Sequence, residues 1–337
     1  MNTRRKLLVA LVSSRKLLIS LGASALAASF AASAQQPGKV WRIGFLGTAS
    51  ASGYVREIEA IRAGLRELGY VEGRNIAIEY RWAESNPERL KAMAAELVAL
   101  KVEVIITHST SGVRAAGQAT KTIPIVIADG PDPVAAGFVA SLARPGGNIT
   151  GSTAFQTELA AKRIELLREV VPRIKRMSVL FNALNPQNDT YAREMESAAK
   201  RMKIELSQFT VKGTEDLPGV FSAMAKKRIE GAVIGEDPLL NSNPVAIAAL
   251  ATTHRLPTIG LTIFAEAGGL LGYGANRPLL YSRAASFVDK ILKGAKPGHL
   301  PIERATKFDL IVNLKTAKAL GLKIPPQFLQ RADKVIE

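Results

Sequence analysis

The chain has 337 residues, 45 Lys and Arg against 29 Asp and Glu, a formal net charge of +16, 47% hydrophobic residues and no cysteine. This length is more than one ordinary hydrophobic core needs, so two domains are expected, and the apolar fraction excludes wholesale disorder. The absence of cysteine excludes disulfides, zinc–thiolate sites, iron–sulfur clusters and a cysteine nucleophile.

Residues 1–34 have the pattern of a secretory signal peptide. Basic residues occupy positions 4–6 and 15–16, an uncharged run follows at 17–32, and residues 32–34 read Ala-Ser-Ala, a small-residue cleavage site. The alternative is a membrane anchor, but the run falls short of the roughly 20 solidly apolar residues that a span needs. We expect export by the general secretory route rather than the twin-arginine route, because the second basic group interrupts the apolar run. No cysteine follows for a lipid tether, so a freely diffusing periplasmic protein is expected.

From residue 40 onward, strand-like and helix-like segments alternate. The hydrophobic pattern predicts strands at 40–47, 75–80, 102–107 and 123–128, and helices between them at 56–68, 86–100 and 109–119. Such alternation is typical of a parallel sheet that is covered by helices on both faces.

The alternation restarts after a Gly-rich turn at 144–148, where we expect the chain to cross to a second lobe. Helices are predicted at 159–170, 189–202, 217–227, 245–254 and 280–292, with a short one from 314. Strands are predicted at 177–181, 204–211, 231–235, 257–261, 269–274 and 308–312. No Pro-rich or Ser-rich linker separates the halves, so the lobes are expected to pack together through short crossovers.

Motifs for catalysis and for metal binding are missing from the sequence. There is no Gly-x-Ser-x-Gly nucleophile elbow, no Gly-x-x-x-x-Gly-Lys phosphate loop and no Gly-x-Gly-x-x-Gly after a strand. His108, His254 and His299 are scattered, so neither a metal nor a cofactor is expected. Glu230 and the pair 236–237 could act as acid–base carboxylates, but a solvated turn and a strand end explain them more simply. An enzyme is therefore not expected.

The positive charge does not indicate a nucleic-acid partner. Five of the positive charges lie in the expected signal peptide, and their removal lowers the formal charge from +16 to +11. The basic clusters at 173–176 and 226–228 lie at helix ends, where they complement the helix dipole, and no aromatic residues are interleaved with them.

Polar loops at the carboxyl ends of strands are the candidate binding site, because ligands of open α/β sheets bind there. Ser109, Thr110 and Ser111 follow a predicted strand and open a helix, so their hydroxyls and the free N–H groups could receive a carboxylate or another anion. Simple N-capping by Ser109 or Thr110 is the plainer explanation. Thr48, in the polar loop after the first strand, is expected to contact the ligand too.

The two halves share a weak echo in which a buried strand runs into acidic residues, Asp129 in the first half and the pair 236–237 in the second. This echo suits two similar lobes that face one cleft, and it makes Asp129 a candidate ligand contact. Asp237 could pair with an ammonium group, with simple capping as an equal alternative. Asn182 and Tyr273 are expected to shape the wall of the second lobe, and core packing is the competing explanation for Tyr273.

Five segments carry a family resemblance: 64–76, 141–151, 267–274, 288–297 and 313–322, which read GLRELGYVEGRNI, SLARPGGNITG, AGGLLGYG, VDKILKGAKP and NLKTAKALGL. Over residues 40–337 the chain resembles the ABC-transporter substrate-binding protein family that includes tryptophan- and tyrosine-type binding proteins of bacteria. The resemblance implies a type I periplasmic binding protein fold, an α/β fold with two Rossmann-like lobes, parallel sheets flanked by helices, and three crossovers. The implied lobes are 39–149 plus 276–300, and 150–275 plus 301–337.

The resemblance also implies a function. The protein would bind a small polar organic ligand, an amino acid or a carboxylate, in the cleft between its lobes, and hinge closure would trap the ligand. An ABC permease in the inner membrane would be its partner, and the protein is expected to be a monomer. The alternatives are a ligand-sensing subunit for a membrane receptor and, less favoured, an exported α/β enzyme.

Overall fold

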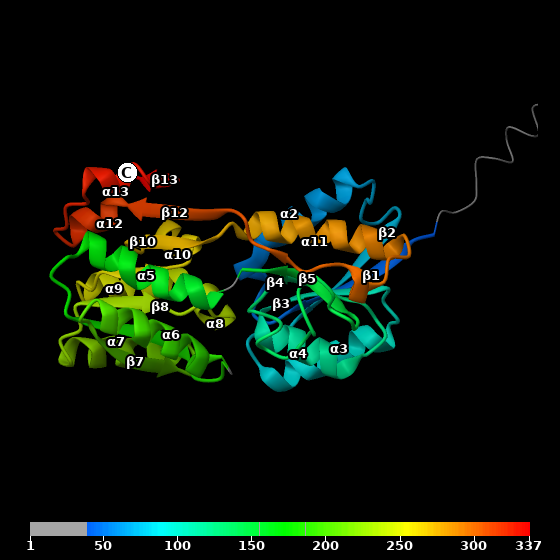
Figure 1. Ribbon diagram of the computed structural model, residues 1–337, viewed down its shortest axis with the longest axis horizontal. Coiled ribbons are helices and arrows are strands. Elements are labelled where there is room, and N and C mark those ends of the chain that lie inside the picture. Colours follow the sequence, from blue (N-terminus) through cyan, green and yellow to red (C-terminus); the bar gives the residue numbers. More distant parts are fainter. Residues whose placement is uncertain (1–38, 155, 186) are drawn as a thin grey trace, which may run out of the picture. The chain divides into compact units, whose positions relative to one another are not determined.

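The computed structural model describes residues 39–154, 156–185 and 187–337, and the signal peptide expected at 1–34 lies outside them. Over the described residues, helices alternate with strands that form two separate sheets (Figure 1). None of the helices in these ranges combines the length and the apolar character that a membrane span requires.

The first sheet has six parallel strands in the order β11-β5-β4-β3-β1-β2. Its central strands are continuous apolar runs, because both faces of the sheet are covered. The strands are β1 (Trp41–Gly47), β2 (Ile76–Trp82), β3 (Val104–His108), β4 (Ile125–Asp129), β5 (Ile149–Thr153) and β11 (Glu303–Arg304).

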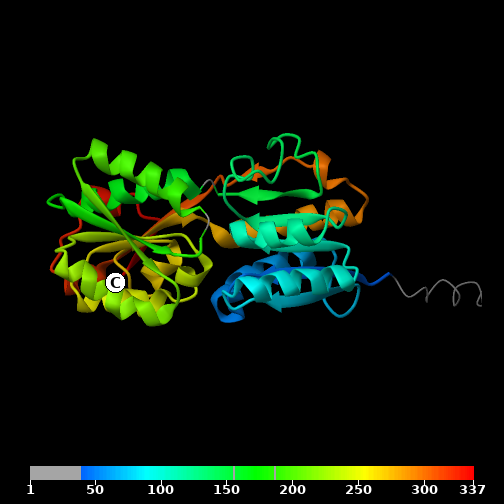
Figure 2. The ribbon, with the colours of Figure 1, turned by 90° about the horizontal axis from the view of Figure 1, so that it is seen from below.

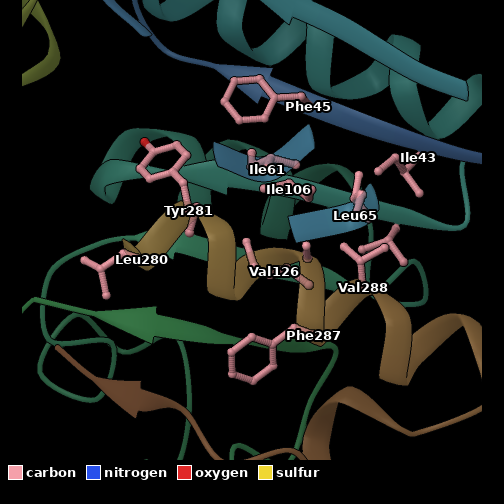
Figure 3. Close-up of a cluster of buried hydrophobic side chains, with 14 of the residues drawn as sticks. Ile43, Phe45, Ile61, Leu65, Ile106, Val126, Leu280, Tyr281, Phe287 and Val288 are labelled. Atoms are coloured by element: carbon pink, nitrogen blue, oxygen red, sulfur yellow. The ribbon is translucent and has the colours of Figure 1, made fainter. Parts of the chain in front are cut away.

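Helices cover both faces of this first sheet. They are α2 (Val55–Glu67), α3 (Pro87–Ala99), α4 (Ser109–Ala119) and α11 (Arg277–Leu292), with the short 3-10 turns η1 (Ala51–Tyr54) and η3 (Pro297–His299). Successive side chains of β3 point to opposite faces, so Ile106 packs with Leu65 of α2 and Val288 of α11 (Figure 3), whereas Ile105 packs under α3 and α4. Figure 2 shows α3 and α4, in cyan and teal, side by side on their face of the sheet.

The second sheet has seven strands in the order β13-β12-β10-β9-β8-β6-β7. Neighbouring strands of this sheet are parallel, as expected, except β10 and β12, which are antiparallel. The reason is that the chain leaves this lobe at the end of β10 and re-enters it through β12. The strands are β6 (Arg176–Asn182), β7 (Glu205–Val211), β8 (Gly231–Ile234), β9 (Thr258–Gly260), β10 (Leu271–Ala275), β12 (Phe308–Asn313) and β13 (Lys334–Ile336).

The second sheet is also covered on both faces. Val179 of β6 lies in a core with side chains of α5 and α6, and its neighbour Leu180 lies in a core with side chains of α7 and α9. The helices are α5 (Gln156–Val170), α6 (Asn188–Arg201), α7 (Leu217–Lys226), α8 (Pro238–Asn241), α9 (Pro244–Thr253), α10 (Thr262–Glu266), α12 (Leu314–Ala319) and α13 (Pro326–Leu329), with the 3-10 turn η2 (Thr214–Asp216).

The chain passes between the two sheets three times over the described residues, between β5 and α5, between β10 and α11, and between β11 and β12. This agrees with the expected three crossovers. The expected boundaries at 149/150 and 300/301 differ from the strand pairing, because β5 and β11 both belong to the first sheet. The strands therefore place the first crossing after Thr153 and the third after Arg304.

The strand β5 was not among the predicted elements because it is polar. Its threonines are nevertheless buried, since their hydroxyls donate to backbone oxygens: Thr150 to Leu300 at 2.8 Å and Thr153 to Pro131 at 2.8 Å. Gly151 has a φ of 127°, and a Cβ there would lie 2.2 Å from the Ile127 oxygen, so this strand needs glycine for its approach to β4.

Candidate functional site

One cavity of about 780 Å³, part of it open to solvent, is lined by residues from both lobes. The first lobe contributes residues at or just after the ends of β1, β2, β3 and β4 and the first residue of α11, and the second lobe contributes residues at or just after the ends of β6 and β8. The cavity therefore lies at the carboxyl ends of the strands, where ligands of α/β sheets bind.

Seven of the eight side chains that the sequence predicts for the site line this cavity: Thr48, Ser109, Thr110, Ser111, Asp129, Asn182 and Asp237. Their contact with a ligand stays a prediction.

Tyr273 does not line the cavity. Its ring lies 6.4 Å from that of Phe308, at an interplanar angle of 25°, and it packs against the cores of both lobes. Its backbone oxygen accepts a hydrogen bond from Arg163 Nε at 2.8 Å. Tyr273 therefore has the surroundings of a core residue, which is the competing explanation that the sequence offers for it.

The start of α4 supplies the hydroxyl groups that line one side of the cavity. Ser109 Oγ lies 3.1 Å from Ser111 Oγ and accepts a hydrogen bond from the Gly112 N–H at 3.4 Å. Ser109 has a φ of 60°, an uncommon conformation for a residue with a side chain. Gly112 lets the helix approach the strand ends closely, because a Cβ there would lie 2.4 Å from Thr107 Oγ1. The hydroxyls are thus held beside the backbone N–H groups of the first helical turn, which have no backbone carbonyl of the helix to donate to.

His108 is a neutral aromatic wall of the cavity. Its Nε2 accepts a hydrogen bond from the Thr48 N–H at 3.3 Å, so the ring proton is on Nδ1. Burial, together with the nearby Arg277 charge, lowers the pKa of His108 to about 3. Its ring lies 4.4 Å from that of Tyr54. The buried Thr48 Oγ1 finds no hydrogen-bond partner among the described residues.

Arg277 carries the positive charge of the first lobe's wall. Its Nη1 lies 3.2 Å from Glu57 Oε1 and its Nε lies 3.5 Å from Asp129 Oδ2, and all three side chains are buried. The guanidinium also lies 5.0 Å from the Tyr54 ring centre and 5.7 Å from that of Tyr281, within the range of cation–π attraction. One buried cation thus faces two buried carboxylates.

Asp129 has a perturbed acidity. Burial raises the pKa of its carboxyl well above the usual range, Arg277 opposes this, and the charges of Glu236 and Glu57 add to it. Its Oδ1 is buried and lacks a hydrogen-bond partner within the described part of the chain. A carboxylate oxygen in this state can accept a hydrogen bond from a ligand.

The second lobe has a buried ion pair at the cavity wall. Arg163 Nη2 of α5 lies 3.0 Å from Oε2 of Glu236, the second residue after β8, and the side chains are 1% and 6% exposed. Glu236 lines the cavity, whereas Arg163 lies behind it.

Asp237 is held by three donors. Asn182 Nδ2 and the Leu239 N–H donate to Oδ1 at 2.9 Å each, and Asn185 Nδ2 donates to Oδ2 at 3.0 Å. Burial raises the pKa of Asp237, and these hydrogen bonds partly offset the shift. The capping role that the sequence offers for Asp237 is therefore present at the start of α8, and the network fixes Asn182 at the cavity wall.

Sequence reasoning missed Arg277 and Tyr54, and it set Glu236 aside as a plain strand end. The segment Asn276-Arg277-Pro278 follows the end of β10 and opens α11, which is the same pattern that selected Ser109 after β3. Applied to β10, that pattern would have found Arg277. No group of three or more His, Asp or Glu able to hold a metal ion occurs in residues 39–154, 156–185 and 187–337.

The chain matches known proteins along almost its whole described length. A family model described as ABC transporter substrate binding protein matches residues 43–336. A tyrosine-binding protein of Clostridioides difficile is 26% identical over 260 residues, which cover 77% of this chain and 74% of the relative.

Two solved structures are also similar. An ABC domain from Streptococcus pneumoniae in complex with L-Trp is 25% identical, with a TM-score of 0.82, and the match covers 88% of this chain and all of that domain. A conserved domain protein from Vibrio cholerae is 27% identical, with a TM-score of 0.83 and the same coverage.

Proposed function

Because the chain belongs to the family of ABC transporter substrate-binding proteins, we propose that its cavity binds a single amino acid and delivers it to an ABC importer. The family is described as one of substrate-binding proteins, so no catalytic role is proposed. The signal-peptide pattern at 1–34 supports export to the periplasm, where an importer takes up its ligands.

The observation that carries this proposal is an excess of buried carboxyl groups over buried guanidinium groups in a cavity that also has a wall of hydroxyls. In the first lobe Arg277 faces both Glu57 and Asp129. In the second lobe Arg163 pairs with Glu236, and Asp237 is held by uncharged donors. Among the described residues of this site, each lobe therefore has one more buried carboxyl than buried guanidinium.

This charge pattern distinguishes the two ligand classes that the sequence leaves open. A ligand with carboxylates alone would add negative charge beside carboxyls whose ionisation burial already disfavours. An amino acid brings an ammonium group that can bind the buried carboxyl groups of the cavity. Its carboxylate can bind at Ser109, Thr110 and Ser111, where the hydroxyls and the helix dipole favour an anion. We therefore favour an amino acid over a simple carboxylate.

The relatives suggest which amino acids to test first. One is named a tyrosine-binding protein and another was solved with L-Trp, and the cavity of this chain has Tyr54, His108 and Tyr191 in its wall. Flat rings in a wall suit an aromatic side chain, so L-Tyr and L-Trp are the first candidates.

Ligand binding would couple to movement of the lobes. The cavity wall comes from both sheets, and the sheets are joined by three short connections. A ligand that contacts both walls favours the closed arrangement by the difference in its affinity for the closed and open forms. The closed form would then be the one that the permease recognises.

A thermal-shift screen tests the proposal. The protein without residues 1–34 is heated with each of the twenty amino acids and with 3-indolepropionate, which has the side chain and carboxylate of L-Trp but no ammonium group. We expect one amino acid to raise the melting temperature by several degrees, because a ligand at about 100 times its Kd adds about 2.7 kcal/mol.

The matched variants are the triple substitution Ser109→Ala, Thr110→Ala and Ser111→Ala and, as a control on the exposed face of β7, Thr210→Ala. The triple variant should lose the shift and the control should keep it. A shift from carboxylic acids alone, or none from any amino acid, would contradict the proposed function.

A further inference from the structure

The acidic ends of two strands, one in each lobe, meet at the same cavity. Asp129 is the last residue of β4, and Glu236 follows the end of β8, and both line the cavity although they belong to different sheets. The two strands are those whose similar acidic endings stand out in the sequence as a weak echo. The fold therefore brings two carboxylates to one space from opposite walls.

Glu236 is held in its place by Arg163 rather than by the loop alone. Arg163 Nη2 is 3.0 Å from Glu236 Oε2, and Arg163 Nε donates to the Tyr273 oxygen of β10 at 2.8 Å. Gly274 leaves room for this guanidinium, because a Cβ there would lie 3.3 Å from Arg163 Nη2. Because the planar guanidinium of Arg163 is fixed by these two contacts, the Glu236 carboxylate has little freedom to turn away from the cavity.

We propose that Glu236, positioned by Arg163, is a second ligand-binding carboxylate, and that the ammonium group of the ligand lies between Glu236 and Asp129 and thereby links the lobes. This inference rests on the proposed function, since it requires a ligand with an ammonium group. It assigns roles to Glu236 and Arg163, and it names the feature that every ligand of the site must share.

The charges around the two carboxylates support this placement. Arg277 and Glu57 face Asp129 from α11 and α2. The rings of Tyr54 and Tyr281 lie beside the Arg277 guanidinium. Both tyrosines stay uncharged because burial raises their pKa.

Arg163 of α5 is the charged partner of Glu236, and Asp237 is the next residue in the chain. Tyr191 of α6 also lies beside Glu236, and it stays uncharged because burial raises the pKa of its hydroxyl. Glu236 acts on Asp129 through space, since its charge raises the pKa of the Asp129 carboxyl. Like charges on opposite walls disfavour close approach of the lobes, and a cation between them removes that repulsion. The ligand's ammonium group would thus favour closure by attracting the carboxylates of both walls at once.

The test compares a ligand with its counterpart that lacks the ammonium group. The dissociation constants of L-Trp and 3-indolepropionate are measured by isothermal titration calorimetry for the wild type, Glu236→Gln, Asp129→Asn and the double variant. If another amino acid binds more tightly in the screen, it and its own deamino acid replace this pair. Glu230→Gln is the matched control, because Glu230 pairs with Arg176 at 3.2 Å outside the cavity.

We expect Glu236→Gln and Asp129→Asn each to weaken binding of the amino acid by about 10- to 100-fold, the range for a hydrogen bond to a charged group. Neither substitution should weaken binding of the deamino acid. The double variant should lose less than the product of the single losses, because both carboxylates bind one ammonium group. Glu230→Gln should bind both probes as the wild type does.

The positioning role of Arg163 has its own readout. Arg163→Lys keeps the charge and loses the two directed contacts, so it should lower the preference for the amino acid over the deamino acid. In the Glu236→Gln background the same substitution should have no further effect on that preference. A purely structural role would weaken both probes alike. If Arg163→Lys does not fold, as judged by circular dichroism, Glu236→Gln still decides the proposal, because it keeps the shape of the side chain.

The outcomes separate the inference from the proposed function. If the wild type binds no amino acid, the proposed function fails and the inference fails with it. If the wild type binds an amino acid but Glu236→Gln keeps the same preference over the deamino acid, the proposed function stands and the inference is overturned.

Discussion

The replacement of Arg277 by Met probes the buried charge cluster beside the cavity. Met has a similar apolar length but no charge, so Arg277→Met leaves Glu57 and Asp129, 3.2 Å and 3.5 Å from the guanidinium in the wild type, without their cation. Removing one partner of a buried ion pair costs about 3–5 kcal/mol. We expect the free energy of unfolding at pH 8 to fall by about that amount, a large share of the about 5–15 kcal/mol of a typical domain.

The loss should depend on pH in a defined direction. Burial raises the pKa of Asp129 and Arg277 opposes this shift, so the pKa rises further when Arg277 is removed. A carboxyl with a raised folded-state pKa is tolerated while it is protonated and destabilises the fold as the pH rises through that pKa. The destabilisation by Arg277→Met should therefore be larger at pH 8 than at pH 5, and Asp129→Asn in the same chain should recover part of it.

Urea unfolding of the ligand-free protein at the two pH values measures these differences. The control is Arg62→Met, because Arg62 also contacts two carboxylates, Glu59 at 2.7 Å and Glu72 at 2.9 Å, but on the surface. An exposed cluster of this kind contributes roughly 1 kcal/mol or less. A loss below about 1 kcal/mol for Arg277→Met, or the same loss at both pH values, would refute the reasoning from buried charge.

Three further predictions concern the helix start, the rim of the cleft and the aromatic residue outside the cavity. Ser109→Ala and Ser109→Gly should weaken ligand binding equally. The glycine variant should nevertheless be more stable by about 1 kcal/mol in urea unfolding, because glycine tolerates the φ of 60°. Equal stabilities would contradict the presence of backbone strain at residue 109. Arg56 of α2 pairs with Glu266 of α10 across the lobes. Arg56→Ala should therefore raise the ligand's dissociation rate, measured by stopped-flow, by up to about fivefold and leave the association rate unchanged. An unchanged dissociation rate would mean that the pair does not hold the lobes together. Tyr273→Phe should leave affinity within about twofold of the wild type by calorimetry, since Tyr273 lies outside the cavity, and a tenfold loss would return it to the site.

The candidate site could be predicted where one local rule applies. Ser109, Asp129 and Asn182 are far apart in the sequence, yet each lies at the carboxyl end of a strand or directly after it, and the parallel strands bring those ends to one cavity. Tyr273 lies away from the cavity for a local reason: it is inside β10, where its ring meets Phe308 of the antiparallel neighbour β12, and only the third crossover creates that pairing.

The remaining features depend on long-range contacts that no short segment encodes. Arg277 reaches Asp129 because the second crossover returns the chain to the first lobe at α11. The strand β5 lacks an apolar run, and its burial depends on hydroxyl bonds to backbone oxygens supplied by distant segments, such as that of Leu300. The sequence pattern thus predicted the strand–helix order well, but not these contacts between elements.

A crystal structure with the amino acid that binds most tightly would test the central claim most directly. We expect the ligand in the cavity between the lobes, with its carboxylate at the hydroxyls of Ser109, Thr110 and Ser111 and its ammonium group within hydrogen-bond distance of Asp129. A ligand bound elsewhere on the protein, or one whose carboxylate faces Asp129, would contradict the proposed site.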